Sequence, residues 1–136
     1  MEENIKKNSR GFTIIELMIA LFVSALAISG YIGANIVTQR QAEALNERAI
    51  AIQEANRVIE QMRNASAGGI FPANVVAAFP NDRTVPGMNA LTNEQVRVSY
   101  ASTTAEPLDA TITVTWLSHT GRSSTAALRT YISKRT

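Results

Sequence analysis

The chain has 136 residues, a formal net charge of +2 and no cysteine. This length allows one domain and an anchor, the small charge does not indicate a nucleic-acid partner, and the lack of thiols excludes disulfides and thiolate metal sites. The composition is ordinary for a folded protein, so the informative property is how the apolar residues are distributed along the chain.

The first predicted element is an apolar helix that follows a short basic start. Residues 12–32 contain one charged side chain, Glu16, and are long enough to cross a bilayer as a helix. Lys6, Lys7 and Arg10 precede this segment. The positive-inside rule therefore predicts an N-terminus in the cytoplasm and a C-terminal part outside it.

Two ordinary interpretations compete for this segment. A secretory signal peptide would be cut near Ala27, but apolar residues continue from Ile28 to Val37. A plain signal anchor would tolerate Glu16, since a central charge costs about 2.5–3.5 kcal/mol on the insertion scale and the many Leu, Ile, Phe and Val residues offset it. An acid inside a membrane helix is nevertheless a functional hypothesis by default.

The stretch RGFTIIEL, residues 10–17, resembles the prepilin signature of type IV pilins and type II secretion pseudopilins. In that family a short basic leader ends in glycine, a phenylalanine follows, and an apolar helix carries glutamate at its fifth position. Gly11, Phe12 and Glu16 occupy these positions here. The resemblance therefore predicts a leader peptide, residues 1–11, and a mature chain that begins at Phe12.

The resemblance also implies a processing and assembly mechanism. A prepilin peptidase would cut between Gly11 and Phe12 on the cytoplasmic side, and the new amine of Phe12 would be N-methylated. In the family, the glutamate meets the amine of a neighbouring subunit and sets the stagger of the filament. Pairing of Glu16 with the amine of its own chain, one helical turn away, remains the alternative. The resemblance favours the contact between subunits.

Gly30 and Gly33 lie near the end of the apolar stretch, among other small residues. Small residues spaced by four allow membrane helices to approach closely, although glycine is also simply frequent in such helices. Many major pilins have a proline in this half of the helix, whereas this chain has none between residues 12 and 64. That departure, with the lack of a disulfide-bounded C-terminal loop, favours an accessory subunit over a major one.

A second, amphipathic pattern continues the helix to about residue 64. Its apolar residues recur at steps of three and four: Leu45, Ala49, Ile52, Ala55, Ile59 and Met62. Because no proline intervenes, we expect one helix of about 53 residues from Phe12 to Asn64. Its first half, residues 12–37, would anchor the chain in the membrane and form the filament core, and its second half, residues 38–64, would pack on a small sheet.

Residues 65–93 are rich in Gly, Pro, Asn and Asp and are predicted to be a connecting loop. Its apolar residues, Phe71, Val75, Val76 and Phe79, would support a short helical turn or pack against the core. A packed connector is the favoured interpretation, and a recognition loop is the alternative.

Three strands are predicted within residues 94–136. Residues 94–101 and 110–118 alternate apolar and polar side chains, residues 124–133 do so less regularly, and residues 119–122 are typical of a hairpin turn. One apolar face per strand indicates an antiparallel sheet covered on one side by the amphipathic helix. The predicted fold class is therefore α+β, a long N-terminal helix packed on a small C-terminal antiparallel sheet, similar to minor pilins of the PilV type.

No catalytic constellation is apparent, so we expect no enzyme, no cofactor and no small-molecule substrate. His119 is interpreted as a solvated turn residue with no acid beside it, and Trp116 as a core residue in phase with the apolar face. The acidic residues do not have the spacing of a calcium loop, and we expect no metal site. Four cations near the C-terminus lack interleaved aromatic residues and are interpreted as solvated surface: Arg122, Arg129, Lys134 and Arg135.

The favoured function is that of a type IV pilus minor pilin, which helps to initiate the filament or is incorporated into it after processing. The expected partners are the prepilin peptidase, other minor pilins, the major pilin and the inner membrane, through residues 12–37. The alternatives are a minor pseudopilin of a type II secretion system, a tip adhesin or competence pilin that takes up DNA, and an ordinary anchored periplasmic protein that is not cut at Gly11.

Overall fold

The computed structural model describes residues 12–134, which fall into two compact units divided between Arg40 and Gln41. The elements, in chain order, are α1 (Ile14–Ala65), α2 (Ala73–Ala78), β1 (Arg83–Thr84), β2 (Gln95–Tyr100), β3 (Leu108–Leu117) and β4 (Ser123–Ile132). The predicted leader, residues 1–11, lies outside the described residues. The order of elements confirms the predicted α+β class, a long N-terminal helix followed by an antiparallel sheet.

Helix α1 ends where small residues and one amide side chain satisfy its last carbonyl groups. The Ser66 backbone N–H donates to the Met62 carbonyl oxygen at 3.0 Å. The Asn74 side-chain amide donates to the Ala65 carbonyl oxygen at 2.6 Å and also to that of Gly68. Gly69 turns the chain with a φ of +81°, a conformation that strains other residues. Asn74 thereby fixes the point at which the chain leaves α1.

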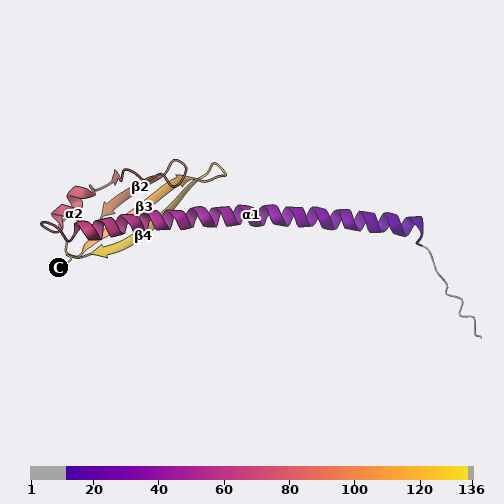
Figure 1. The fold of residues 1–136 in the computed structure, drawn as a ribbon, viewed down its shortest axis with the longest axis horizontal. Helices are drawn as coiled ribbons and strands as arrows, with labels where there is room; N and C mark the ends of the chain where they lie inside the picture. Colours follow the sequence, from indigo (N-terminus) through magenta and orange to yellow (C-terminus); the bar gives the residue numbers. More distant parts are fainter. Residues whose placement is uncertain (1–11, 135–136) are drawn as a thin grey trace, which may run out of the picture. The chain divides into compact units, whose positions relative to one another are not determined.

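The sheet contains four antiparallel strands in the order β1-β2-β3-β4. The three predicted strands are present within one or two residues of their predicted ends, and Figure 1 shows them beside the last part of α1. The hairpin between β3 and β4 is closed by the N–H of Gly121, which donates to the Ser118 carbonyl oxygen at 2.8 Å. The sequence analysis missed β1, because two residues among loop-forming neighbours have no detectable alternation.

One face of the sheet packs against α1 and forms the core. Along β3, every second side chain from Leu108 to Trp116 is buried, as the alternation predicted. Burial of such side chains stabilises a fold by about 1.5–3 kcal/mol each. The core residues are Ala51, Ala55, Val58, Ile59, Met62, Val75, Val96, Val98, Leu108, Ala110, Ile112, Val114, Trp116, Ala126 and Ile132. The amphipathic half of α1 is therefore the cover of the sheet, as predicted.

The predicted face of this helical half was partly wrong. Leu45 is 69% exposed and Ala49 is also exposed, whereas Ala51 and Val58, which the pattern did not include, are fully buried. Each residue advances about 100° around a helix, so Ala51 lies on the same side as Val58 while Ala49 lies well away from it. The spacing of three and four residues identified the helix correctly. The same spacing fits more than one face of the helix, so it did not decide which face is buried.

The connecting segment, residues 65–93, packs against the core as the favoured interpretation predicted. Val75 of α2 is buried, and the predicted helical turn is present. The Tyr100 hydroxyl donates to the Phe79 carbonyl oxygen at 2.8 Å, and burial raises the pKa of Tyr100 to about 12. Asn81 accepts the Tyr100 backbone N–H at 3.1 Å. Tyr100 thus ties the connector to the sheet.

Replacing Met62 by alanine tests the position of the core. Met62 is fully buried, so Met62→Ala should lower the free energy of unfolding by about 2–5 kcal/mol. The measurement is urea denaturation of the full chain in detergent micelles, followed by the fluorescence of Trp116, the single tryptophan. Leu45→Ala is the matched control and should change stability by less than about 0.5 kcal/mol. Equal effects of the two substitutions would contradict the observed core.

Candidate functional site

The candidate site begins at Thr13, which caps the N-terminus of α1. Its hydroxyl oxygen accepts the backbone N–H of Glu16 at 3.3 Å, and its carbonyl oxygen accepts that of Leu17 at 3.1 Å. A threonine three residues before a glutamate is the sequence pattern of a capping box. The sequence analysis missed this role of Thr13, although the Thr-x-x-Glu signal was present. The cap fixes the first helical turn, and with it the position of Glu16.

Glu16 lies in this first turn and is exposed. The unpaired N–H groups of a helix N-terminus carry a partial positive charge, which favours an acidic side chain there. Glu16 is also the only charged residue between Phe12 and Arg40. Phe12, the predicted new N-terminus, is 85% exposed. Gly11, the predicted residue before the cut, lies outside the described residues.

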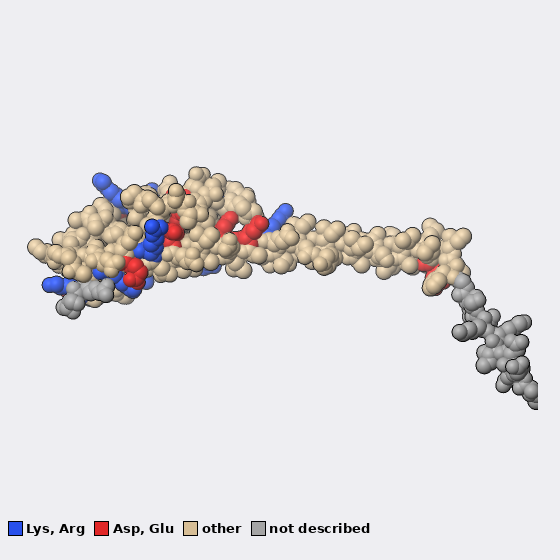
Figure 2. All heavy atoms as spheres, viewed as in Figure 1, with Lys and Arg blue, Asp and Glu red and all other residues tan. Residues whose placement is uncertain are grey.

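The first part of α1 exposes apolar side chains all round. Its candidate membrane segment is long and apolar enough to cross a bilayer and has no buried residue. Figure 2 shows this part of the helix almost without charge, whereas acidic and basic side chains gather over the unit that holds the sheet. The large exposed side chains are Phe12, Ile14, Ile15, Leu17, Met18, Ile19, Leu21, Phe22, Val23, Leu26, Ile28, Tyr31, Ile32, Ile36 and Val37. Such a surface suits lipid or other apolar helices rather than water.

Four polar side chains in this part of α1 donate to carbonyl oxygens of their own helix. The hydroxyl groups of Ser24 and Ser29 reach the residues four positions earlier at 2.7 and 2.8 Å. The Asn35 amide and the Thr38 hydroxyl do the same at 3.1 and 3.0 Å. A bilayer offers no water to such groups, so internal pairing removes the cost of placing them in lipid. Glu16 therefore differs from these four polar side chains.

Residues 6–32 match the family model of the prokaryotic N-terminal methylation motif. The matched range includes Gly11, Phe12 and Glu16. No curated protein and no solved structure matches the chain significantly. The motif supports a type IV pilin-like or pseudopilin protein, with a structural rather than an enzymatic role. It implies processing by a prepilin peptidase and assembly with other pilins, and with the apolar helix it is consistent with membrane anchoring.

A second polar cluster joins α1 to the β3–β4 hairpin, and it corrects the interpretation of His119. The sequence analysis placed no acid beside this residue, but its Nε2 lies 2.9 Å from Glu43 Oε2 and its Nδ1 lies 3.5 Å from Glu47 Oε1. Glu43 and Glu47 precede buried Ala51 and Ala55 at four-residue steps, on the side of the helix that faces the sheet. This four-residue spacing was the sequence signal that could have placed Glu43 and Glu47 on the side of the helix that faces the sheet.

Glu47 is the centre of this cluster. Its carboxylate accepts the backbone N–H of His119 at 2.9 Å and the indole N–H of Trp116 at 3.1 Å. These two hydrogen bonds, the backbone one above all, lower the pKa of Glu47 below its usual value. A carboxylate with a lowered pKa stabilises the fold above its ordinary pKa and loses that contribution as the pH falls through the lowered one. Glu47 therefore holds the hairpin tip on α1 at neutral pH.

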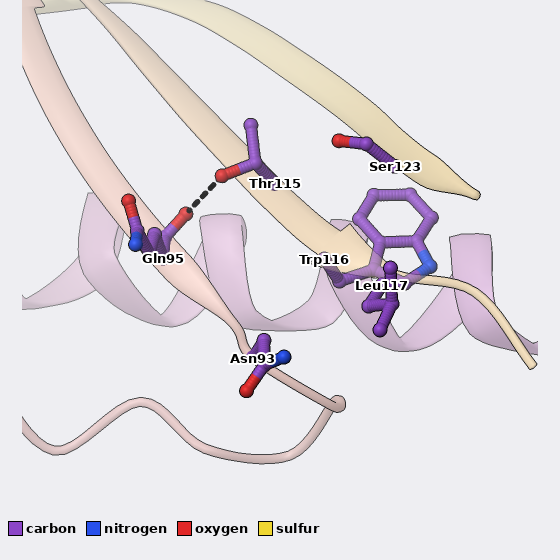
Figure 3. A pocket seen from close by; sticks show the side chains of 6 residues that line it. All are labelled: Asn93, Gln95, Thr115, Trp116, Leu117 and Ser123. Carbon is purple, nitrogen blue, oxygen red and sulfur yellow. Dashed lines mark hydrogen bonds between the residues drawn. The ribbon is translucent and has the colours of Figure 1, made fainter. Parts of the chain in front are cut away.

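The far face of the sheet carries polar groups without a catalytic arrangement. Figure 3 shows a shallow hollow at one end of β2, β3 and β4, where the Thr115 hydroxyl donates to the Gln95 carbonyl oxygen at 3.3 Å. Its lining contains no carboxylate, imidazole or amine, so it offers hydrogen bonds but no group that exchanges a proton near neutral pH. The lining residues are Asn93, Gln95, Thr115, Trp116, Leu117 and Ser123.

Arg129, one of the C-terminal cations, is paired with Asp109. Arg129 donates from Nε to Asp109 Oδ1 at 2.9 Å and forms a second hydrogen bond with the same carboxylate. This guanidinium lowers the pKa of Asp109. Arg135 lies outside the described residues. The pairing of Arg129 reduces the positive charge available for a nucleic acid on this surface.

Replacing Glu47 by glutamine tests the anchoring of the hairpin. Glu47→Gln keeps the size of the side chain but removes its charge, and hydrogen bonds to a charged group contribute about 1.5–3 kcal/mol. We expect lower stability at pH 7 and a smaller difference at pH 3, because the parent chain loses the contribution of Glu47 as the pH falls toward and through its lowered pKa. Urea denaturation of the full chain at both pH values measures this. Glu106→Gln, at an exposed position that forms no ion pair with the described residues, is the control and should not change the pH profile. If stability depended on pH in the same way in the parent chain and in Glu47→Gln, the result would contradict the role of Glu47 in holding the hairpin on α1.

Proposed function

We propose that the chain is a minor pilin of a type IV pilus, which helps to initiate the filament or is incorporated into it after processing. The observation that carries this proposal is the methylation motif at residues 6–32, placed at the start of a helix whose exposed apolar part is followed by a small α+β head. The chain has no cysteine, and its apolar helix has no proline. Both properties favour an accessory subunit over a major subunit.

In this proposal the chain has four functional parts after removal of the leader, residues 1–11. Residues 12–37 anchor the precursor in the inner membrane and later form the filament core. Residues 38–64 and the sheet, residues 94–136, form a head that lies outside the cytoplasm, and residues 65–93 connect them. Lys6, Lys7 and Arg10 support this orientation through the positive-inside rule.

Glu16 is proposed to be the assembly residue. After cleavage the amine of Phe12 is a cation one helical turn from Glu16, at the start of a segment that has no other charged side chain before Arg40. Two chains at equal depth each hold an amine that repels its neighbour, whereas two staggered chains bring one amine to the other chain's carboxylate. In a low-dielectric surrounding, the pairing removes the cost of a buried unpaired charge. The exposure of Phe12 and the position of Glu16 in the capped first turn support this contact.

A minor pseudopilin of a type II secretion system is the second candidate, because that family shares the same N-terminal motif. Co-purification from the native host separates the two. A minor pilin is recovered with sheared pili, whereas a pseudopilin is recovered with the secretion machinery. A tip adhesin or competence pilin would have the same scaffold, and its head would bind a surface or DNA.

The processing step can be tested by intact-mass measurement of the membrane-bound chain. We expect a mature chain that begins at Phe12 and carries one methyl group on its amine. Gly11→Val should leave the leader attached, because a β-branched side chain hinders the extended backbone in a narrow protease cleft. Ser9→Val is the matched control in the leader and should still be cut. A mature chain that begins at Ile28, or an uncut parent chain, would refute the proposal.

The assembly step can be tested by replacing Glu16 with glutamine. Glu16→Gln should be inserted and cut normally, but its amount in sheared filaments should fall about tenfold or more, since loss of 1.4 kcal/mol already changes an equilibrium tenfold. Immunoblotting of the sheared and cell-bound fractions measures the ratio. Ser24→Ala is the control, because its hydroxyl donates only to its own helix. Normal incorporation of processed Glu16→Gln would show that the amine does not depend on this carboxylate.

A further inference from the structure

The tip of the β3–β4 hairpin contacts α1 through polar groups, and the imidazole of His119 is one of these groups. Glu47 accepts two N–H groups from the hairpin, those of the His119 backbone and the Trp116 indole. The imidazole of His119 lies against the same helix, with Glu43 and Glu47 one turn apart. All these residues belong to the unit from Gln41 to Thr136. The tip is therefore held within one compact unit.

Both ring nitrogens of His119 face a carboxylate. Nε2 lies 2.9 Å from Glu43 Oε2, and Nδ1 lies 3.5 Å from Glu47 Oε1. A neutral imidazole has one N–H and one lone pair, whereas an imidazolium has two N–H groups. With a neutral ring, one of the two nitrogens has no proton to offer the carboxylate oxygen near it. The doubly protonated ring is thus the form that matches both carboxylates.

The other charged groups near the tip do not compete for this position. Within residues 12–134, neither Glu43 nor Glu47 forms an ion pair with any lysine or arginine, including Arg40 and Arg48 of α1 and Arg122 of the hairpin. On the hairpin side, the Trp116 indole and the Ser118 side chain are the uncharged groups that contact Glu47. In the described part of the chain, His119 is therefore the basic side chain that lies near both carboxylates.

We infer that His119 is a pH-sensitive latch between the β3–β4 hairpin and α1: its doubly protonated ring bridges Glu43 and Glu47 and holds the hairpin tip down, and loss of a ring proton loosens the tip. Histidine is the side chain that ordinarily changes charge between about pH 5 and 8. The two hydrogen bonds to Glu47 remain after deprotonation, so the tip loosens without unfolding of the sheet. Since the lowered pKa of Glu47 keeps its carboxylate ionised throughout this interval, the change in the bridge comes from the histidine.

The latch has a built-in reporter, because Trp116 is the single tryptophan and its indole N–H donates to Glu47. The experiment is hydrogen exchange of this indole N–H and of the His119 amide by NMR, with the full chain in detergent micelles. Protection factors, corrected for the intrinsic pH dependence of exchange, are compared at pH 5.5 and 8. We expect protection about two- to fivefold higher at pH 5.5, the range typical of partly exposed ion pairs.

Three variants separate the latch from a general effect of pH. His119→Gln should give equal protection at both pH values, at the low level of the parent at pH 8. His119→Lys stays cationic over this interval and should also lose the pH dependence. Glu43→Gln leaves His119 and both hydrogen bonds to Glu47 in place, and should reduce the ratio toward one. A parent chain with equal protection at both pH values, or an unchanged ratio in His119→Gln or Glu43→Gln, would overturn the inference.

Discussion

The charge of Glu16 is the constraint around which the first part of α1 is arranged. Between Phe12 and Arg40 it is the single acidic or basic residue, while Ser24, Ser29, Asn35 and Thr38 donate to their own backbone. A lipid-facing helix can satisfy hydroxyl and amide groups internally, but no such internal partner neutralises a carboxylate. The capped first turn holds this group at the end of the helix, four residues after Phe12, the proposed new N-terminus.

The second part of α1 meets a different requirement, because it must cover a sheet. Its buried residues are mostly small or branched, and Ala51 and Ala55 allow the strands to approach closely. Farther toward the N-terminus the same side of the helix carries Glu47, which accepts two N–H groups from the hairpin, and Glu43, whose Oε2 lies 2.9 Å from His119 Nε2. The transition from apolar to polar contacts along one side of the helix marks where the core ends and the solvated edge of the head begins.

The sequence predicted the architecture well because its strongest signals are periodic. A run of apolar residues and the alternation in β3 each depend on local geometry, so the long helix, three strands and the hairpin could be predicted. The match of Gly11, Phe12 and Glu16 to a known motif likewise needs no structure. Contacts between distant segments leave no such pattern, and His119 therefore seemed isolated although Glu43 lies beside it. The two-residue strand β1 was too short to show any period at all.

The internal hydrogen bonds of Ser24, Ser29, Asn35 and Thr38 have a mechanical consequence. A polar side chain that bonds to its own backbone presents no donor that a neighbouring helix would have to release. Two such helices in contact meet through dispersion forces between side chains rather than through hydrogen bonds of these four residues. Separating the two helices therefore breaks none of these four hydrogen bonds, because each side chain keeps its partner within its own helix.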